Sequence, residues 1–236
     1  MGAAPLVTLH VWRVPRRALG GALLRMARDP RRLRALPGVS FGKLLGTGTG
    51  VGFGPGDADL TRYAAVLAWD DPAGGDLGPV GAGWDAAAVQ AARVDLTPLV
   101  SRGTWSGRAP FGEPGAGARG KEGAGPVLAL TRARLRPARA LTFWRAVPPV
   151  AREVAAAPGL LARFGIGEAP IVWQGTVSVW RSAADLTRFA YRQPEHRAVI
   201  ARTQSVRWYA EDLFARFAVR GISGDRAVLG WQEGER

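Results

Sequence analysis

The chain has 236 residues and a formal net charge of +13, with 47% hydrophobic residues, nine tryptophans and no cysteine. This length permits one large domain or two fused small ones, and the composition excludes a disordered chain, disulfides, thiolate metal ligands and a cysteine nucleophile. The apolar runs are too short to span a membrane, and no signal peptide is recognisable, so we expect a cytoplasmic protein whose excess arginine favours acidic partners.

The first half of the chain alternates predicted strands and helices. A Gly/Pro-rich stretch over 70–85 interrupts them and is expected to be a surface loop. In chain order, the predicted elements are a strand at 6–14 (LVTLHVWRV), a helix from Arg16, a strand leading into the glycine-rich run 44–55, a strand at 63–69, and a helix followed by a strand within 86–100.

The same succession recurs in the second half, where VLALTRARL matches LVTLHVWRV. A Pro-Gly pair, Pro158 and Gly159, stands where Pro37 and Gly38 stand in the first half. The predicted elements are a strand at 127–135, a helix from Ala138, the segment ARFGIGE from Ala162, a strand at 171–180, and a helix followed by a strand within 198–219.

The repeated order of strand, helix, strand, strand, helix, strand is that of a ferredoxin-like unit. Two such units commonly pack sheet against sheet, which buries the face that neither sheet covers alone. We therefore predict an α+β fold in which two tandem ferredoxin-like units form a dimeric α/β barrel. The segment 111–126 has the composition of a flexible linker, so the units are predicted to cover 1–110 and 127–236.

Three short motifs fail on their context. The run LLGTGTGVGFGP lacks the third glycine of a dinucleotide fingerprint, and GAGARG within the linker has neither a preceding strand nor a following helix. The GVSFG sequence around Ser40 resembles a hydrolase elbow, but it leads into glycines that cannot hold a helix. Nucleotide binding and serine hydrolysis are therefore not expected.

The chain has only two histidines, His10 and His196, which leaves no room for a three-histidine zinc centre. His10 alternates with Thr8 and Trp12 on one face of the first strand, where a structural role is the ordinary interpretation. His196 follows Pro194 at the predicted start of a helix and has apolar neighbours. It is either an ordinary core or surface histidine or a single protein ligand to haem iron.

Four strings together resemble the spheroidene monooxygenase family of carotenoid biosynthesis, and they cover nearly the whole chain in order. They are GKLLGTGTGVGF from Gly42, RGTWSGRAPF from Arg102, FGIGEAPIVWQGTVSVW from Phe164 and WYAEDLFARF from Trp208. The resemblance implies a haem protein with a dimeric α/β barrel fold that inserts oxygen into a carotenoid with electrons from a ferredoxin. His10 and the insertion at 74–83 depart from the family pattern, and the substrate could differ there.

The resemblance and the chemistry of the residues together give a set of predicted site residues. His196 is the predicted axial ligand of haem b iron, and His10 is a predicted catalytic proton carrier, because its unperturbed pKa is near neutrality. The remaining predicted cofactor contacts are Lys43, Arg102 and Arg108 as partners of the propionates, Trp105 beside the porphyrin, and Gly46 and Gly48 in a turn that lets the backbone approach the cofactor. Each of these also has an ordinary interpretation as a solvated cation, a core aromatic residue or a flexible glycine.

Two other functions remain open on the sequence. Similar barrels use haem iron as a Lewis acid in aldoxime dehydration, which would give the chain a nitrogen-containing substrate with His10 as proton carrier. A non-catalytic basic protein would bind nucleic acid, but the arginines are dispersed and no nucleic-acid motif occurs, so no nucleic acid is expected. The expected partners are an apolar small-molecule substrate and a ferredoxin-type electron donor, while a peripheral membrane contact and the oligomeric state stay open.

Overall fold

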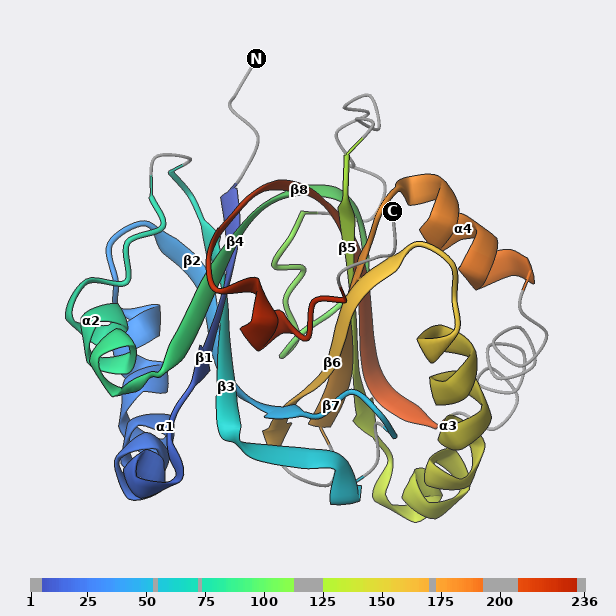
Figure 1. The fold of residues 1–236 in the computed structure, drawn as a ribbon, viewed down its shortest axis with the longest axis horizontal. Coiled ribbons are helices and arrows are strands. Elements are labelled where there is room, and N and C mark those ends of the chain that lie inside the picture. Colours follow the sequence, from blue (N-terminus) through green and yellow to red (C-terminus); the bar gives the residue numbers. More distant parts are fainter. Residues whose placement is uncertain are drawn as a thin grey trace.

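The computed structural model describes residues 6–52, 55–71, 74–112, 125–169, 173–192 and 208–232. Within these residues, antiparallel strands close into a barrel in the order β1-β3-β2-β6-β7-β5-β8-β4 (Figure 1). The strands are β1 (Leu6–Arg13), β2 (Val39–Gly48), β3 (Ala58–Trp69), β4 (Gln90–Gly103), β5 (Val127–Leu135), β6 (Leu160–Ala169), β7 (Trp173–Trp180) and β8 (Tyr209–Gly224). The helices are α1 (Leu19–Arg34), α2 (Gly78–Ala87), α3 (Ala140–Ala155) and α4 (Ala183–Arg192), with short turns η1 (Arg16–Ala18), η2 (Pro55–Asp57), η3 (Pro137–Arg139) and η4 (Arg226–Leu229).

Each half of the chain contributes four neighbouring strands to one α+β barrel. The order strand, helix, strand, strand, helix, strand occurs twice, and β4-β1-β3-β2 is followed around the barrel by β6-β7-β5-β8. The two halves meet along two seams of unequal length. Strands β4 and β8 pair from Ala92 to Gly103, whereas β2 and β6 pair through Gly46–Gly48 and Gly165–Gly167.

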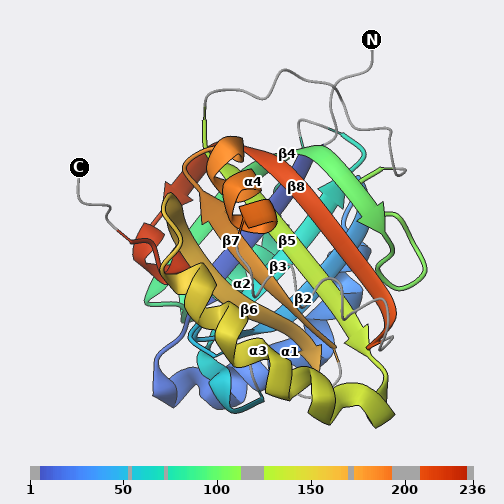
Figure 2. The same ribbon diagram turned by 90° about the vertical axis from the view of Figure 1, so that its right-hand side faces the viewer.

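The helices cover the outside of the barrel. In Figure 1, α1 and α2 flank the first half on the left and α3 and α4 flank the second half on the right. Figure 2 looks onto α3 and α4 and shows both lying across the outer side of β5, β6 and β7. Among the described residues, no helix has the length and apolar character needed to cross a lipid bilayer.

The alternation of the strands sorts apolar side chains into three clusters. The barrel interior contains Val7, Leu9 and Val11 of β1 together with inward residues of the other strands. A first outer cluster, which includes Trp12, Tyr63, Trp69 and Trp84, lies between the first half and α1 and α2. A second outer cluster, which includes Leu160, Trp180, Leu186 and Phe189, lies between the second half and its helices.

The prediction of a surface loop over 70–85 is wrong from Gly78 onward, where α2 begins. The helix has a proline in its first turn, a position at which proline's missing N–H costs nothing. Val80 and Trp84 are buried one turn apart and anchor α2 on the first outer cluster. The glycines and the proline that suggested a loop therefore precede a helix held by tertiary packing.

The glycine-rich run is the predicted turn only in its second part, because β2 continues to Gly48 and the bends begin at Gly50. Gly46 and Gly48 belong to β2 and pair with β6. A Cβ atom on Gly48 would lie 3.0 Å from the Asp57 carbonyl oxygen, and one on Gly50, whose φ is +87°, would lie 2.7 Å from the Arg163 carbonyl oxygen. The glycines thus permit close approach of backbone to backbone where the barrel closes, and this accounts for them without a ligand.

Candidate functional site

A tight turn after β4 carries Trp105 into the barrel interior. The backbone amides of Trp105 and Arg108 donate to each other's carbonyl oxygens at 2.8 and 3.3 Å, and Ser106 and Gly107 both have positive φ. Trp105 is fully buried and packs against Phe41 with ring centroids 5.3 Å apart. The sequence motif RGTWSGR therefore forms a plug at one end of the barrel, which we call the Trp105 turn (104–108).

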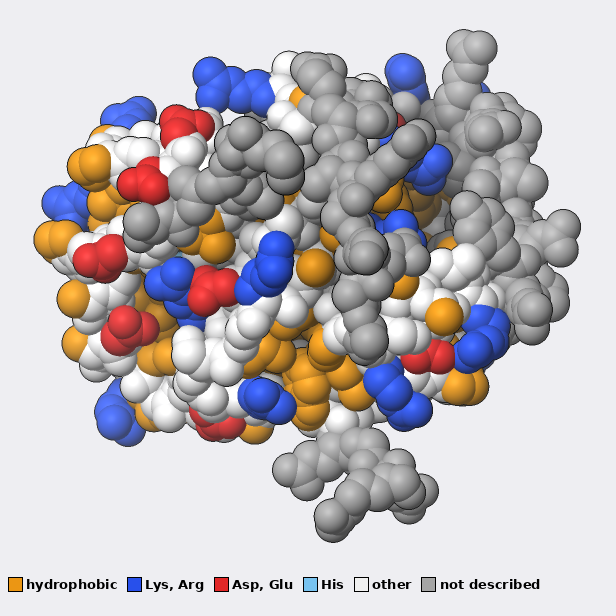
Figure 3. All heavy atoms as spheres, turned by 90° about the horizontal axis from the view of Figure 1, so that it is seen from above, with side chains coloured by type: hydrophobic (Ala, Val, Ile, Leu, Met, Phe, Trp, Pro, Cys, Tyr) orange, Lys and Arg blue, Asp and Glu red, His pale blue; other side chains and the backbone are white. Residues whose placement is uncertain are grey.

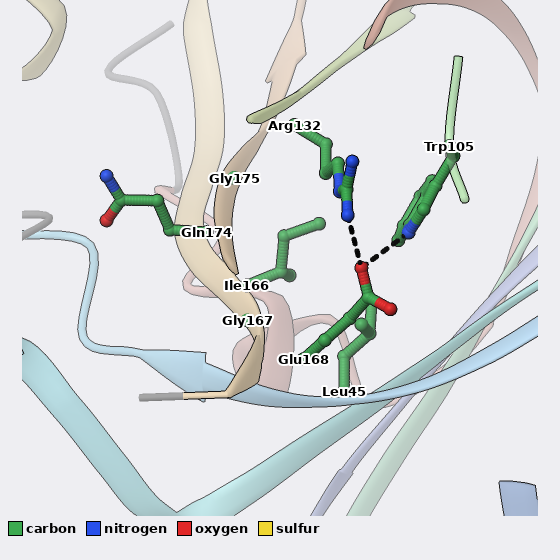
Figure 4. A pocket seen from close by; sticks show the side chains of 8 residues that line it. All are labelled: Leu45, Trp105, Arg132, Ile166, Gly167, Glu168, Gln174 and Gly175. Carbon is green, nitrogen blue, oxygen red and sulfur yellow. Dashed lines mark hydrogen bonds and ion pairs between the residues drawn. The ribbon is translucent and has the colours of Figure 1, made fainter. Parts of the chain in front are cut away.

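Four charged side chains lie beneath this turn and form what we call the inner ion network: Lys43, Arg132, Glu168 and Glu211. Arg132 is only 3% exposed and donates to Glu168 Oε1 at 3.0 Å and to Glu211. Lys43 Nζ donates to Glu168 Oε2 at 2.6 Å. Trp105 Nε1 donates to Glu168 Oε1 at 2.7 Å (Figure 4). Two cations thus face two carboxylates, so the buried charges are paired.

Hydrogen bonds tie Glu211 to the Trp105 turn. Its Oε1 accepts from the Gly107 amide at 2.7 Å and from Thr104 Oγ1 at 3.1 Å. Burial alone would raise the pKa of Glu211, but the hydrogen bond from the Gly107 amide, together with the hydrogen bond and charge of Arg132, lowers this pKa to about 2. Glu211 therefore stays ionised at neutral pH and holds the turn in place.

A small pocket adjoins the inner ion network. Its volume is about 150 Å³, including the part open to solvent, and Arg132 Nε is buried there without a hydrogen-bond partner. The lining residues are Leu45, Trp105, Arg132, Ile166, Gly167, Glu168, Gln174 and Gly175 (Figure 4). Side chains crowd this space, which leaves no room for an enclosed water molecule and excludes a porphyrin.

A different region of the second half has an exposed polar residue on the outer side of a central strand. Thr131 of β5 is exposed although β5 has strand neighbours on both sides, and it lies across from Thr176 of β7 and Phe214 of β8. These three residues and Ala133 share the outward phase of their strands, and we call them the open β5 face. The Arg102 guanidinium lies 5.3 Å above the Phe214 ring at its edge.

Helix α3 is attached at its two ends, on either side of this face. At its start, the Phe143 ring contacts Trp208 edge-on at 5.6 Å, and Trp208 Nε1 donates to Thr142 Oγ1 at 3.0 Å. Toward its end, Val154 packs on the second outer cluster with Ala157. The middle of the outer side of β5 is left with small side chains and an exposed threonine.

The structure distributes the predicted cofactor residues over several places. Lys43 and Trp105 meet in the inner ion network, and the exposed Arg108 donates to the Ser40 carbonyl oxygen at 3.4 Å nearby. Arg102 stands apart from them, beside the open β5 face. His196 lies outside the described residues, so its role as a haem ligand stays a prediction.

His10 lies on the outer side of the first half, away from both regions. Its ring stacks on Trp12 with centroids 5.6 Å apart, and its Nε2 is buried without a hydrogen-bond partner. Burial, assisted by the charge of Arg93, lowers the pKa of His10 to about 3. It is therefore neutral near pH 7 and, with so low a pKa, poorly matched to carrying protons there.

Sequence reasoning did not select Arg132, Glu168 or Glu211. The signal that could have found them is a charge on the inward phase of a strand, because Arg132 follows the buried Leu128 and Leu130 at the same spacing of two. Glu168 continues the buried series of Phe164 and Ile166 in the same way. An inward charge of this kind requires a buried partner, and so predicts an ion network.

The chain is 34% identical over 230 residues to the spheroidene monooxygenase of Rhodobacter capsulatus. The alignment covers 93% of this chain and 92% of that protein. It belongs to the spheroidene monooxygenase family. The enzyme of that name from Rubrivivax gelatinosus is 33% identical over 193 residues, covering 80% of this chain and 72% of that protein. Membership of this family supports an oxygenase, and hence an oxidoreductase. The chain matches no family model.

Solved structures share the barrel at low sequence identity. An aldoxime dehydratase in complex with butyraldoxime aligns with a TM-score of 0.58 and 10% identity, covering 92% of this chain and 79% of that one. A second aldoxime dehydratase structure aligns with a TM-score of 0.57 and 12% identity, covering 92% and 81%. At these identities, the similarity between this chain and the two aldoxime dehydratases shows a shared fold and no more.

Proposed function

We propose that the chain is a haem-dependent monooxygenase that inserts oxygen into an apolar substrate such as a carotenoid, with electrons from a ferredoxin-type donor. The family match over 93% of the chain is the observation that carries this proposal. The formal net charge of +13 supports an acidic donor, since opposite charges speed the encounter of two proteins. The repeated order of elements supports two ferredoxin-like units.

The open β5 face is the place we propose for haem b. Thr131 is small and exposed on the outer side of the sheet, and Phe214 beside it offers an aromatic surface for a flat macrocycle to pack against. Arg102 is exposed at the edge of this face, where its guanidinium can bind a propionate carboxylate through two hydrogen bonds. Thr131, Phe214 and Arg102 support a haem site on this face, and His196 is proposed as its axial ligand.

When bound, haem would supply the activation of molecular oxygen. The chain's own residues position the group and exclude water. Phe214 and helix α3 would pack against it, and Arg102 would bind a propionate at its polar edge. Arg132 follows Thr131 directly in β5 and points into the barrel. Its ion pairs with Glu168 and Glu211 therefore hold β5 in place from the barrel interior, while the outer side of the same strand carries the open β5 face.

Absorption spectroscopy of the purified protein tests the cofactor. We expect a Soret band that follows the protein through gel filtration. His196→Ala should lose most of the bound haem, or shift the band to that of a weakly ligated iron, while His10→Ala, in the other half of the barrel, should retain the haem. An unchanged spectrum and activity in His196→Ala would show that another residue ligates the iron.

Oxygen dependence tests the reaction class. Monooxygenation stops when oxygen is removed, whereas Lewis-acid dehydration of an aldoxime proceeds without it. Assaying a carotenoid and an aldoxime with and without oxygen therefore separates the two reactions. Conversion of the aldoxime alone, under anaerobic conditions, would replace the monooxygenase proposal.

A further inference from the structure

Much of the chain's positive charge is concentrated in one surface segment. Between residues 16 and 34 the sequence has seven arginines and one aspartate, which gives this segment +6 of the formal +13. The aspartate, Asp29, is 1% exposed and lies 3.2 Å from Arg28 and 3.8 Å from Arg32. The exposed arginines of this segment are Arg16, Arg17, Arg28, Arg31, Arg32 and Arg34.

Large apolar side chains stand exposed beside this charge. Leu23 and Leu24, in the second turn of α1, are 59% and 62% exposed. Leu141, in the first turn of α3, is 72% exposed, and Leu60, near the start of β3, is 65% exposed. The starts of α1, α3 and β3 all lie along the lower side of the molecule in both Figure 1 and Figure 2. These exposed leucines therefore belong to elements that begin on the same side of the molecule, and a continuous apolar patch on that side would mark a surface for an apolar partner.

The beginning of α3 repeats the composition of the beginning of α1. Arg136, Arg139 and Arg145 are exposed around Leu141, and the sequence from 136 to 145 contains no acidic residue. Each half of the chain therefore presents arginines and leucine together at the same side. We call this surface, formed by 16–24, 136–145 and Leu60, the lower face.

The acidic side chain nearest in sequence to Leu60 is already engaged. Asp59 accepts from Arg13 Nη1 at 3.2 Å and from the amide of Thr61 at 3.0 Å. The opposite side of the molecule, seen in Figure 3, has acidic and basic side chains interspersed. The segments 16–24 and 136–145 of the lower face carry five exposed arginines, Arg16, Arg17, Arg136, Arg139 and Arg145, and no acidic residue.

We propose that the lower face docks on an anionic lipid bilayer, with the leucines entering the headgroup boundary and the arginines contacting lipid phosphates. Arginine and leucine side by side at the start of a helix are the combination that binds the interface of a membrane. An acidic protein surface would match the arginines but would leave the four leucines without an apolar environment. This inference stands on the surface itself and does not depend on the haem or on the substrate.

Sedimentation with lipid vesicles tests the proposal. We expect the full chain to bind phosphatidylcholine vesicles that contain about one third phosphatidylglycerol, to bind pure phosphatidylcholine at least about tenfold more weakly, and to dissociate as salt rises. Absence of binding to the anionic vesicles overturns the proposal. Salt-dependent binding to an acidic ferredoxin without vesicle binding would assign the face to a protein partner instead.

Paired variants separate the leucines from the arginines. Leu23→Ser with Leu24→Ser should weaken vesicle binding about tenfold, because two apolar side chains no longer leave water. Arg16→Ser with Arg17→Ser should weaken it at least about tenfold and reduce its salt dependence. Unchanged binding in the leucine pair would overturn insertion.

Two control variants lie off the lower face. Val100→Ser removes an apolar side chain that is 38% exposed on β4, and Arg188→Ser removes a charge from α4. Both should leave vesicle binding within about twofold of the parent, and an equal loss in these controls would show that the binding is not specific to the lower face. Because all the substituted side chains are exposed, thermal unfolding should confirm that each variant is folded.

Discussion

The two halves of the barrel place equivalent strands at β1 and β5, and their outer faces differ. Leu6 pairs with Trp69 at the end of β3, and Val127 pairs with Trp180 at the end of β7, which sets the correspondence. On this register His10 corresponds to Thr131 and Trp12 corresponds to Ala133. The outward positions of β1 therefore carry large rings where those of β5 carry small side chains.

This difference decides how the helices pack. In the first half, Trp12 stacks on Trp84 of α2 at 5.4 Å and Trp84 packs on Tyr63 at 5.1 Å, so the outer face is filled. In the second half, Thr131 is exposed beneath a helix attached at its ends. The same succession of elements thus yields a closed core on one side and an open face on the other, because side-chain volume at two strand positions differs.

The largest expected effect comes from removing the aromatic residue that closes the first half. Trp84→Ala should lower the free energy of unfolding by about 3–5 kcal/mol, since Trp84 is fully buried. Trp144→Ala in α3, where the side chain is only half-buried, should cost roughly 1 kcal/mol. Urea unfolding measures both, and equal losses would show that α3 is packed as tightly as α2.

The second effect is a dependence of stability on pH that arises in the first half. The pKa of His10 is about 3 in the folded chain and near 6.5 when unfolded, so the unfolded state takes up the proton first as pH falls. His10 therefore contributes full stability above pH 6.5 and progressively less toward pH 3, a loss on the order of 4 kcal/mol.

His10→Phe keeps a flat ring against Trp12 but cannot be protonated. The free energy of unfolding of this variant should therefore no longer fall between pH 6.5 and 5. The carboxylate Glu211 loses its contribution only from about pH 4.5 downward, so its titration does not obscure that window. Unfolding by urea at several pH values gives the slope. A parent protein whose stability is flat from pH 6.5 to 5 would show that His10 titrates normally.

The smallest effect on stability is expected on the open β5 face. Thr131→Trp gives the second half a large ring where the first half has His10, and at an exposed position this should change the free energy of unfolding by at most about 0.5 kcal/mol. If the face binds haem, the same variant should lose the Soret band, while Thr131→Ser keeps it. A Thr131→Trp protein with full haem content would place the cofactor elsewhere.

The sequence was sufficient to predict the elements whose pattern is local. The alternation at 6–14 and its repeat at 127–135 correspond to β1 and β5, because a period of two reports the two faces of a strand directly. The α+β class followed from the repeated order. Helix α2 was missed because its glycines favour a loop, and only burial of Trp84 overrides that preference.

The candidate site was harder to predict because its residues meet only through the closed barrel. Lys43, Glu168 and Glu211 come from β2, β6 and β8 and are brought together by strand register that no local pattern contains. Thr131 carries no sequence signal of its own, since its exposure reflects the size of its neighbours. Trp105 was selected from its motif, but its burial depends on residues of distant strands. Its indole donates to Glu168 of β6, and the Gly107 amide of the same turn donates to Glu211 of β8.

The unequal seams between the halves have a consequence for how the barrel fluctuates. Along β4 and β8 many successive residues pair, whereas β2 and β6 join through Gly46–Gly48 and Gly165–Gly167. Local opening follows the segment with the fewest hydrogen bonds and the least buried side-chain area, which is the glycine seam. Transient separation of the two sheets should therefore begin there, with β4 and β8 acting as the hinge, and backbone amides of the glycine seam should exchange with solvent before those of the hinge.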